Sequence, residues 1–174
     1  MNEIVVTAVG TDRPGIVAAL TGALLELGGN LEETRAALLR GSFATALAVA
    51  VPDGVGVPEV EAALRPVAEE LGLGLWVGPA AARDEGPRPR RSIVSVYGAD
   101  HPGIVHGMAV GLAEHGANIV DLSARLVGDP PIYVLGIEVE HEEGAEGPLR
   151  SALGDVARAH GVELTLEPED DEVM

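Results

Sequence analysis

The stretch Gly10-Thr11-Asp12-Arg13-Pro14-Gly15-Ile16-Val17 decides the fold of this chain. It follows residues 4–9, a short run rich in β-branched residues that predicts a strand. It leads into a segment whose apolar residues recur every three or four positions, as on one face of a helix. Asp12 can accept hydrogen bonds from the first helical N–H groups, Pro14 suits the first turn, and Gly15 allows close approach to the backbone. The sequence therefore predicts a strand–turn–helix unit whose helix N-terminus could hold an anion.

The same stretch returns 88 residues later as residues 98–105. Residues 4–17 and 92–105 are identical at 7 of 14 positions without a gap, and the match continues as far as Asn30 and Asn118. Chance does not produce such a match in a short domain. The chain is therefore a duplicated unit, and the Asp-x-Pro-Gly turn is its best-preserved part.

The composition narrows the class of protein. Apolar residues make up 47% of the 174 residues, aromatic residues only 2%, and the absence of cysteine excludes disulfides and thiolate chemistry. The formal charge of −17 opposes binding to nucleic acid or to anionic membranes. No signal peptide precedes the first strand, and no apolar stretch is long enough to span a membrane. We therefore expect a soluble, cytoplasmic protein.

The order of the expected elements predicts the fold class. In the first unit we expect a strand over 3–9, a helix over about 14–28, strands over 31–39 and 43–51, a second helix after Gly54, and a last strand over 73–77. Pro66 should kink or interrupt the second helix. The second unit repeats the order over 93–97, 102–115, 118–127, 132–140, 148–160 and 162–166. This order predicts an α+β fold of two ferredoxin-like βαββαβ units, each an antiparallel four-stranded sheet with both helices on one face.

The domain boundaries follow from the repeat. We expect a first domain over 1–78, a linker over 79–91, a second domain over 92–167 and an acidic tail over 168–174. The arginines of the linker could form a phosphate or nucleic-acid patch, but the overall charge favours a solvated linker.

One predicted strand, 43–51, alternates large residues with alanine. Phe43, Thr45, Leu47, Val49 and Val51 should face the helices, which places four alanines on the opposite, open face of the sheet. A contiguous apolar stripe suggests a contact with a second chain or with the other unit, whereas alanine that merely fills a solvated strand would need no partner.

The chain carries no recognisable catalytic set. We find no pair of nucleophile and base, no phosphate loop and no dinucleotide fingerprint. His101 and His106 do not have the i, i+4 spacing of paired helical metal ligands, so we interpret both as structural histidines. An RNA-recognition module would need aromatic residues on its central strands and a basic face. We therefore expect no enzyme activity, no cofactor and no bound metal.

The duplicated turn allows two interpretations. It could be only a good helix start, with a capping Asp, a Pro and a Gly. It could also be a site for a small anion or amino acid, because Gly15 and Gly103 open the backbone where a cap alone would tolerate a larger residue.

The motif Gly-x-Asp-x-Pro-Gly-Ile-Val, followed by a helix that ends in Leu-Gly-Gly-Asn-Leu or His-Gly-Ala-Asn-Ile, resembles the ACT domain. That family comprises small regulatory modules that bind amino acids. Two tandem copies with nothing else resemble the glycine cleavage system transcriptional repressor family, and residues 33–43 are similar to the strand hairpin of that group. The resemblance covers nearly the whole chain apart from linker and tail.

The resemblance implies an effector at the first strand–helix turn, often where two such modules meet. Helix N–H groups would hold the α-carboxylate of the ligand, and an Asn or Asp would take its ammonium group. On this sequence the implied ligand-binding residues are Asp12, Arg13, Gly15, Ile16 and Asn30 in the first copy, and Asp100, His101, Gly103, Ile104 and Asn118 in the second.

These expectations combine into one functional hypothesis and two alternatives. We expect a regulatory protein that senses a small amino acid such as glycine, forms a homodimer or higher oligomer, and controls a partner protein. Any effect on transcription should pass through a DNA-binding partner. The alternatives are a regulatory subunit of an amino-acid biosynthetic enzyme, of the acetolactate synthase small-subunit type, and a structural interaction module without a ligand.

Overall fold

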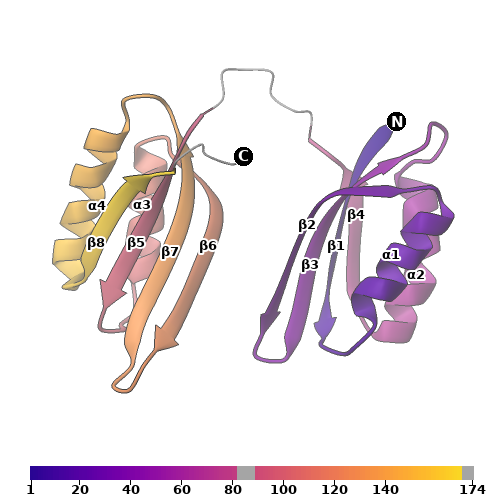
Figure 1. Ribbon diagram of the computed structural model, residues 1–174, viewed down its shortest axis with the longest axis horizontal. Coiled ribbons are helices and arrows are strands. Elements are labelled where there is room, and N and C mark those ends of the chain that lie inside the picture. Colours follow the sequence, from indigo (N-terminus) through magenta and orange to yellow (C-terminus); the bar gives the residue numbers. More distant parts are fainter. Residues whose placement is uncertain (82–88, 170–174) are drawn as a thin grey trace. The chain divides into compact units, whose positions relative to one another are not determined.

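A computed structural model describes residues 1–81 and 89–169 of the chain. The chain divides into two compact units, 1–84 and 85–174 (Figure 1). Among the described residues, no helix is long and apolar enough to cross a membrane.

Each unit has the predicted order of elements. The first contains β1 (Asn2–Thr11), α1 (Ile16–Glu26), β2 (Asn30–Leu39), β3 (Ser42–Val51), α2 (Val57–Leu71) and β4 (Gly74–Pro79). The second contains β5 (Arg90–Gly98), α3 (Ile104–Glu114), β6 (Asn118–Val127), β7 (Ile132–His141), α4 (Glu146–His160) and β8 (Glu163–Pro168). The strand orders are β2-β3-β1-β4 and β6-β7-β5-β8, with every pair antiparallel. The predicted pair of ferredoxin-like units is confirmed.

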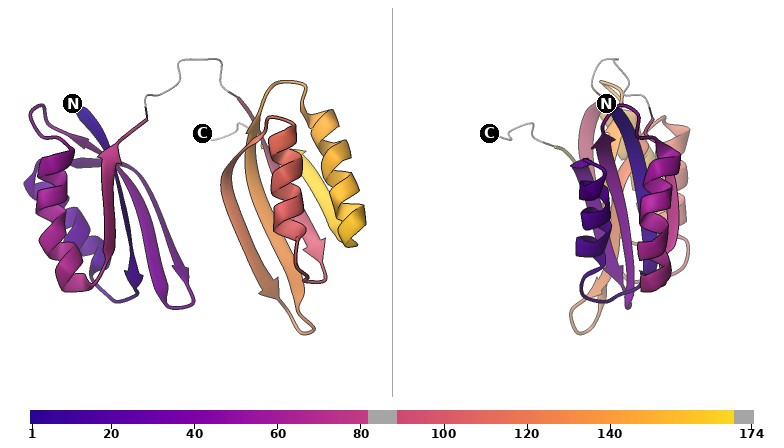
Figure 2. Two further views of the ribbon diagram at one scale, coloured as in Figure 1. Left: turned by 180° about the vertical axis from the view of Figure 1, so that it is seen from behind. Right: turned by 90° about the vertical axis from the view of Figure 1, so that its right-hand side faces the viewer.

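The core of each unit lies between one face of the sheet and its two helices (Figure 2). In the first unit, Leu47, Val49 and Val51 of β3 are buried and Phe43 packs against them, as the alternation predicts. Leu20 and Leu24 of α1 meet this face, and Leu112 of α3 does the same in the second unit. Burial of these aliphatic side chains is the main stabilising contribution, because aromatic residues are nearly absent.

Two local expectations need correction. Helix α2 is not interrupted at Pro66. The proline lies on the exposed side of α2, where the carbonyl that it leaves without a partner can bind water, while Val60, Leu64 and Ala68 hold the helix on the core. Arg90 and Arg91, assigned above to the linker, are the first residues of β5, and their guanidinium groups pair with Glu143 and Glu140.

The segments between and after the two units are described only in part. Strand β4 ends at Pro79 and strand β8 at Pro168. The predicted arginine-rich linker and acidic tail otherwise lie largely outside the described residues, which resume at residue 89 and end at residue 169.

Candidate functional site

The β1–α1 and β5–α3 turns begin their helices without the predicted aspartate cap. The residue that precedes α1 is Gly15, with φ 95°, and the residue that precedes α3 is Gly103, with φ 104°. Neither helix has a side-chain hydrogen bond at its N-terminus, so the prediction that Asp12 caps α1 is wrong. Pro14 also lies before the helix rather than in its first turn. A left-handed glycine turns the chain into the helix here, a conformation that other residues adopt only at a cost.

Hydrogen bonds from Asp12 and Arg13 fix the first turn to two other parts of the unit. The Asp12 N–H donates to the Gly41 carbonyl at the β2–β3 hairpin, over 2.9 Å. The Arg13 guanidinium donates to the Glu70 carbonyl near the end of α2, also over 2.9 Å. Sequence reasoning placed Arg13 in the ligand site, whereas the structure shows it anchoring the turn to α2.

His101 occupies the corresponding place in the second turn. Its Nε2 lies 2.7 Å from the carbonyl oxygen of His160 at the end of α4, and its Nδ1 lies 3.3 Å from the Pro102 carbonyl. The two imidazole rings are stacked with their centroids 5.1 Å apart. Hydrogen bonds to the His160 carbonyl and then to the Pro102 carbonyl raise the pKa of His101, because only an imidazolium donates from both nitrogens. Both units therefore tie the variable residue of the turn to the last carbonyls of their second helix.

The raised pKa of His101 predicts a pH-dependent stability. A folded-state pKa above the ordinary 6.5 stabilises the fold fully below 6.5, and this contribution is lost as the pH rises through the folded value. We expect the melting temperature of the second unit to fall between a pH below 6.5 and one about two units higher. In His101→Gln, which keeps a neutral donor, this part of the pH dependence should disappear. Scanning calorimetry of both proteins checks this, and equal pH profiles would contradict it.

The space above the two glycines differs. A Cβ atom built on Gly15 would meet no atom within 4 Å. A Cβ atom on Gly103 would lie 3.1 Å from Cε1 of His160, so the imidazole covers the second turn. The first turn is therefore open at its backbone, and the second is narrowed by the chain's own side chain.

Two predicted site residues point into the core instead of toward the turn surface. Ile16 and Ile104 each retain only 2% of their accessible surface and belong to the core clusters of their units. Asp12, Gly15, Asp100 and Gly103 remain exposed. The periodicity that marked the two isoleucines as helical residues was itself a signal of burial.

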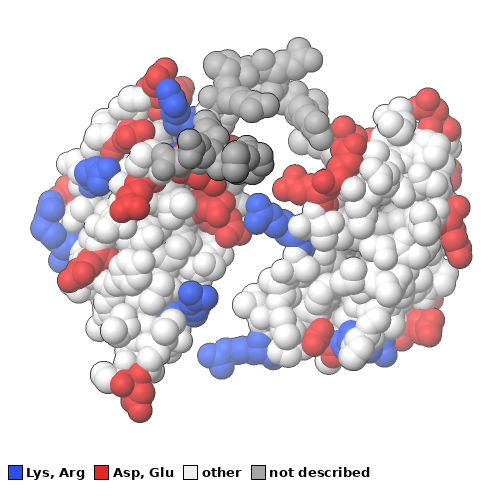
Figure 3. Space-filling model, viewed as in Figure 1, with Lys and Arg blue, Asp and Glu red and all other residues white. Residues whose placement is uncertain are grey.

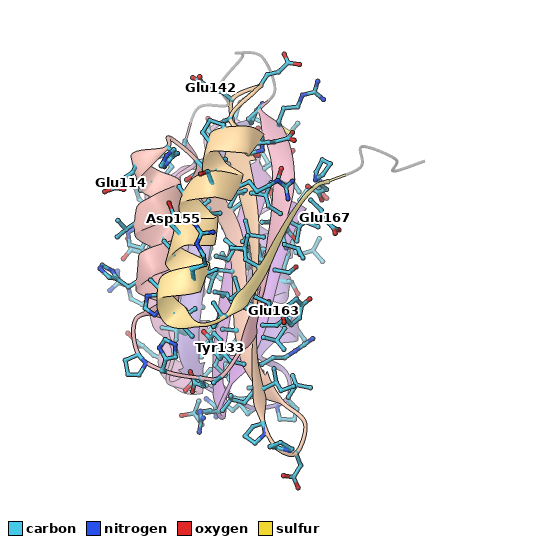
Figure 4. The ribbon with its side chains drawn as sticks, turned by 90° about the vertical axis from the view of Figure 1, so that its left-hand side faces the viewer. Glu114, Tyr133, Glu142, Asp155, Glu163 and Glu167 are labelled. Carbon is cyan, nitrogen blue, oxygen red and sulfur yellow. The ribbon has the colours of Figure 1, made fainter. Side chains whose placement is uncertain are left out.

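Asn30 and Asn118 lie at the other end of the sheet from the turn of their own unit. Asn30 pairs with Ala50, which lies opposite Glu3, whereas Gly10 beside the turn lies opposite Phe43. Seven residues of β1 separate these two rows, which is roughly 23 Å at about 3.3 Å per residue. In the second unit, Asn118 pairs with Glu140, which lies opposite Arg91, whereas Gly98 beside the turn lies opposite Tyr133. Figure 4 shows Tyr133 and Glu142 well apart along the sheet. A single unit therefore cannot bring its asparagine to its own turn.

The electrostatics of the turns suit an anion. Helix α2 has Glu59 in its first turn, and the Glu59 carboxylate accepts from the Gly56 N–H; α4 has Glu146 in its first turn. Helices α1 and α3 have no acidic residue in the first turn. The first N–H groups of a helix lack intrahelical partners and carry the positive end of its dipole. The N-terminus of α1 thus has no side-chain cap, and no atom lies over Gly15.

The opposite end of the second unit has a separate pocket of about 600 Å³, whose lining includes Asn118, Arg90 and His141. His141 is buried, and its Nε2 lies 2.9 Å from the Ser92 hydroxyl. Sequence reasoning missed this buried polar pair. In the described part of the chain, no cluster of His, Asp or Glu side chains could hold a metal ion.

Comparisons with known proteins agree with this architecture. A family model described as the ACT domain matches residues 2–77 and 90–167. A UPF0237 protein from Methanopyrus kandleri is 38% identical over 80 residues, which cover 46% of this chain and 89% of that protein. The glycine cleavage system transcriptional repressor of Escherichia coli (strain K12) is 31% identical over 124 residues, which cover 71% of this chain and 65% of the repressor.

A solved structure extends the likeness to nearly the whole chain. An unknown protein from Galdieria sulphuraria superimposes with a TM-score of 0.87 at 28% identity, covering 97% of this chain and 98% of that one. Each of the two segments that the family model matches covers one βαββαβ unit, except for the last one or two residues of its final strand, and contains one Asp-x-Pro-Gly turn. The chain therefore belongs to the ACT domain family, with two copies of the domain in tandem.

Proposed function

We propose that this protein is a non-enzymatic regulator that binds a small amino acid, such as glycine, at the β1–α1 turn and controls a partner protein in the cytoplasm. The observation that carries the proposal is the start of α1, which has neither a capping side chain nor an atom above Gly15. A helix end of this kind can receive a carboxylate.

The chemistry of an α-amino acid matches the residues of the turn. Its carboxylate would accept from the first N–H groups of α1, and the exposed carboxylate of Asp12 is available for its ammonium group. One contact with a helix dipole contributes only about 0.3–1 kcal/mol. Micromolar affinity needs about −8 kcal/mol, so several hydrogen bonds must act together.

Asn30 and Asn118 enter this proposal as contributions from a neighbouring copy of the chain. Their distance from the turn of their own unit means that neither asparagine can reach a ligand bound at that turn. The second turn is a less favourable binding site than the first, because the His160 side chain lies over Gly103. We therefore assign the effector to the first turn, with Asp12 and Gly15 as its principal residues.

Two observations support a regulatory role through a protein partner. The chain is similar to a transcriptional repressor of the glycine cleavage system. Acidic side chains are spread over the surface of both units (Figure 3), and the net charge is −17. Such a surface opposes direct binding to DNA, so we assign DNA binding to the partner.

A charge placed in the first turn of α1 tests the site. Val17 is exposed there, and Val17→Glu adds a carboxylate that competes for the free N–H groups. We expect at least a 10-fold loss of amino-acid affinity, about 1.4 kcal/mol. The melting temperature should hold or rise, because an acidic residue stabilises a helix N-terminus. Thermal-shift screening of the twenty amino acids identifies the ligand, and calorimetry then measures both proteins.

Leu25→Glu is the matched control, since Leu25 is exposed on α1 but near its other end. It introduces the same charge and should leave the affinity unchanged. Equal affinities for Val17→Glu and the wild type would rule out the proposed location. If none of the twenty amino acids raises the melting temperature, the protein is a structural module without such a ligand.

A further inference from the structure

The open face of the first sheet carries a row of four residues that runs across all its strands. Arg35 of β2 lies opposite Ala46 of β3, Ala46 opposite Thr7 of β1, and Thr7 opposite Trp76 of β4. The neighbouring Leu47 is buried on the helix side, so this row faces away from the helices. A cation therefore ends the row on one edge strand and an indole ends it on the other, with small residues between them.

The residues on the two central strands of this face differ systematically in size. Strand β1 presents Val5, Thr7 and Val9, and these lie opposite Ala48, Ala46 and Ala44 of β3. Val9 is 54% exposed and Trp76 55% exposed, and they belong to one contiguous apolar surface with the alanines of β3. A Cβ atom built on Gly78 would lie 2.4 Å from the indole of Trp76, so the ring covers the backbone of β4. The face is thus smooth on β3 and raised on β1 and β4.

A two-fold axis parallel to the strands makes this face complementary to itself. The rotation reverses the strand order, so that β1 of one copy lies over β3 of the other and β4 lies over β2. Each β-branched residue of β1 then meets an alanine, and each Trp76 meets the Arg35 of the second copy. Arg35 forms no ion pair within residues 1–81 and 89–169, so its guanidinium is available to an indole.

The corresponding face of the second sheet lacks this complementarity. There, Ser95 lies between Gly136 and Thr165, so no aromatic residue stands where Trp76 does. The adjacent row places Ile93 between Glu138 and Glu167, and the same rotation would set Ile93 against a carboxylate. Glu138 lies on the central strand β7 and favours contact with water, whereas the first sheet has alanines on its central strand β3 and a carboxylate, Glu33, on the edge strand β2.

We propose that the open face of the first unit is the interface of a two-fold homodimer, with Trp76 of each copy packed on Arg35 of the other. Sheets that pack face to face lie about 10 Å apart, which leaves room for indole–guanidinium stacking at the two edges. The valine-over-alanine contacts fill the centre. This interface is independent of the amino-acid site proposed above.

Charged substitutions at the two ends of the row, Trp76 and Arg35, test the interface. Sedimentation equilibrium of the full chain should give twice the subunit mass of 17.8 kDa. Trp76→Arg sets two guanidinium groups against two others, and we expect a dimer dissociation constant roughly 100-fold higher. The double variant Trp76→Arg/Arg35→Glu pairs the new arginine with the new carboxylate of the second copy and should restore the dimer. Thr165→Arg makes the same substitution at the matched position of β8 and should not change the mass.

Fluorescence gives an independent measurement because Trp76 is the single tryptophan of the chain. Its emission should shift to longer wavelength on dilution, with the midpoint at the dissociation constant from sedimentation, and Thr165→Arg should behave identically. A wild-type protein that is monomeric at all concentrations would overturn the proposal. So would a Trp76→Arg variant that remains dimeric, or a folded double variant that remains monomeric.

Discussion

Replacing His141 with valine is expected to lower the free energy of unfolding of the second unit by about 2 kcal/mol. His141 and Ser92 retain 3% and 1% of their accessible surface, and they share a hydrogen bond of 2.9 Å. The Nδ1 atom of His141 lies 2.9 Å from the Glu142 carbonyl, which fixes Nδ1 as a donor. In the neutral ring, Nε2 therefore accepts from the Ser92 hydroxyl. Removing the imidazole leaves this hydroxyl buried without its partner, and urea unfolding measures the cost.

The first unit supplies the control. In the second unit, Ser92 lies opposite Val139, and His141 follows two residues after Val139. In the first unit, Ile4 lies opposite Val49, and Val51 follows two residues after Val49. Ile4 and Val51 therefore occupy the places of Ser92 and His141. Ile4 and Val51 are both buried, so the same fold holds an apolar pair at this place. The double variant Ser92→Ile/His141→Val should recover most of the lost stability, with a coupling energy of about 1–2 kcal/mol. Strictly additive single effects would show that the hydrogen bond does not link the two residues energetically.

The elements and their pairing could be predicted because they follow from local patterns. The alternation in residues 43–51 identified β3 and its buried side, and the burial of Leu47, Val49 and Val51 confirms it. The repeat identified the second unit without any further assumption. Pro66 does not interrupt α2, because the cost of a proline is local, whereas the burial that holds α2 together is a property of the whole unit.

The candidate site was harder to predict, since it depends on contacts between distant segments. The bond from Arg13 to Glu70 spans 57 residues, and that from His101 to His160 spans 59. Neither hydrogen bond can be recognised in the sequence, which shows only that a long polar side chain occupies the same position of the turn in both copies. Asn30 was assigned to the site only through the family resemblance, and because α1 carries the chain to the far end of the sheet, Asn30 lies away from the turn of its own unit.

Replacing Gly107 with alanine is expected to destabilise the second unit by about 1–3 kcal/mol, although alanine is the better helix former. Gly107 lies in α3 against α4, and a new Cβ atom would lie 2.8 Å from Cγ1 of Val156 and 3.3 Å from Nε2 of His160. Val156 is β-branched and cannot move its methyl group aside without leaving its preferred rotamer. Relief therefore requires α3 and α4 to separate, and the buried contacts of Met108 with the core would loosen as they do.

Gly22→Ala makes the same chemical change where the structure offers open space. Gly22 lies in the interior of α1, and a Cβ atom there would meet nothing within 4 Å. That variant should gain about 0.5–1 kcal/mol from the lower conformational entropy of its unfolded chain. Urea unfolding of the two variants should thus give free-energy changes of opposite sign. If Gly107→Ala also gained stability, α3 and α4 would have to lie further apart than their contacts at Gly107 indicate, and His160 would no longer be held over the second turn.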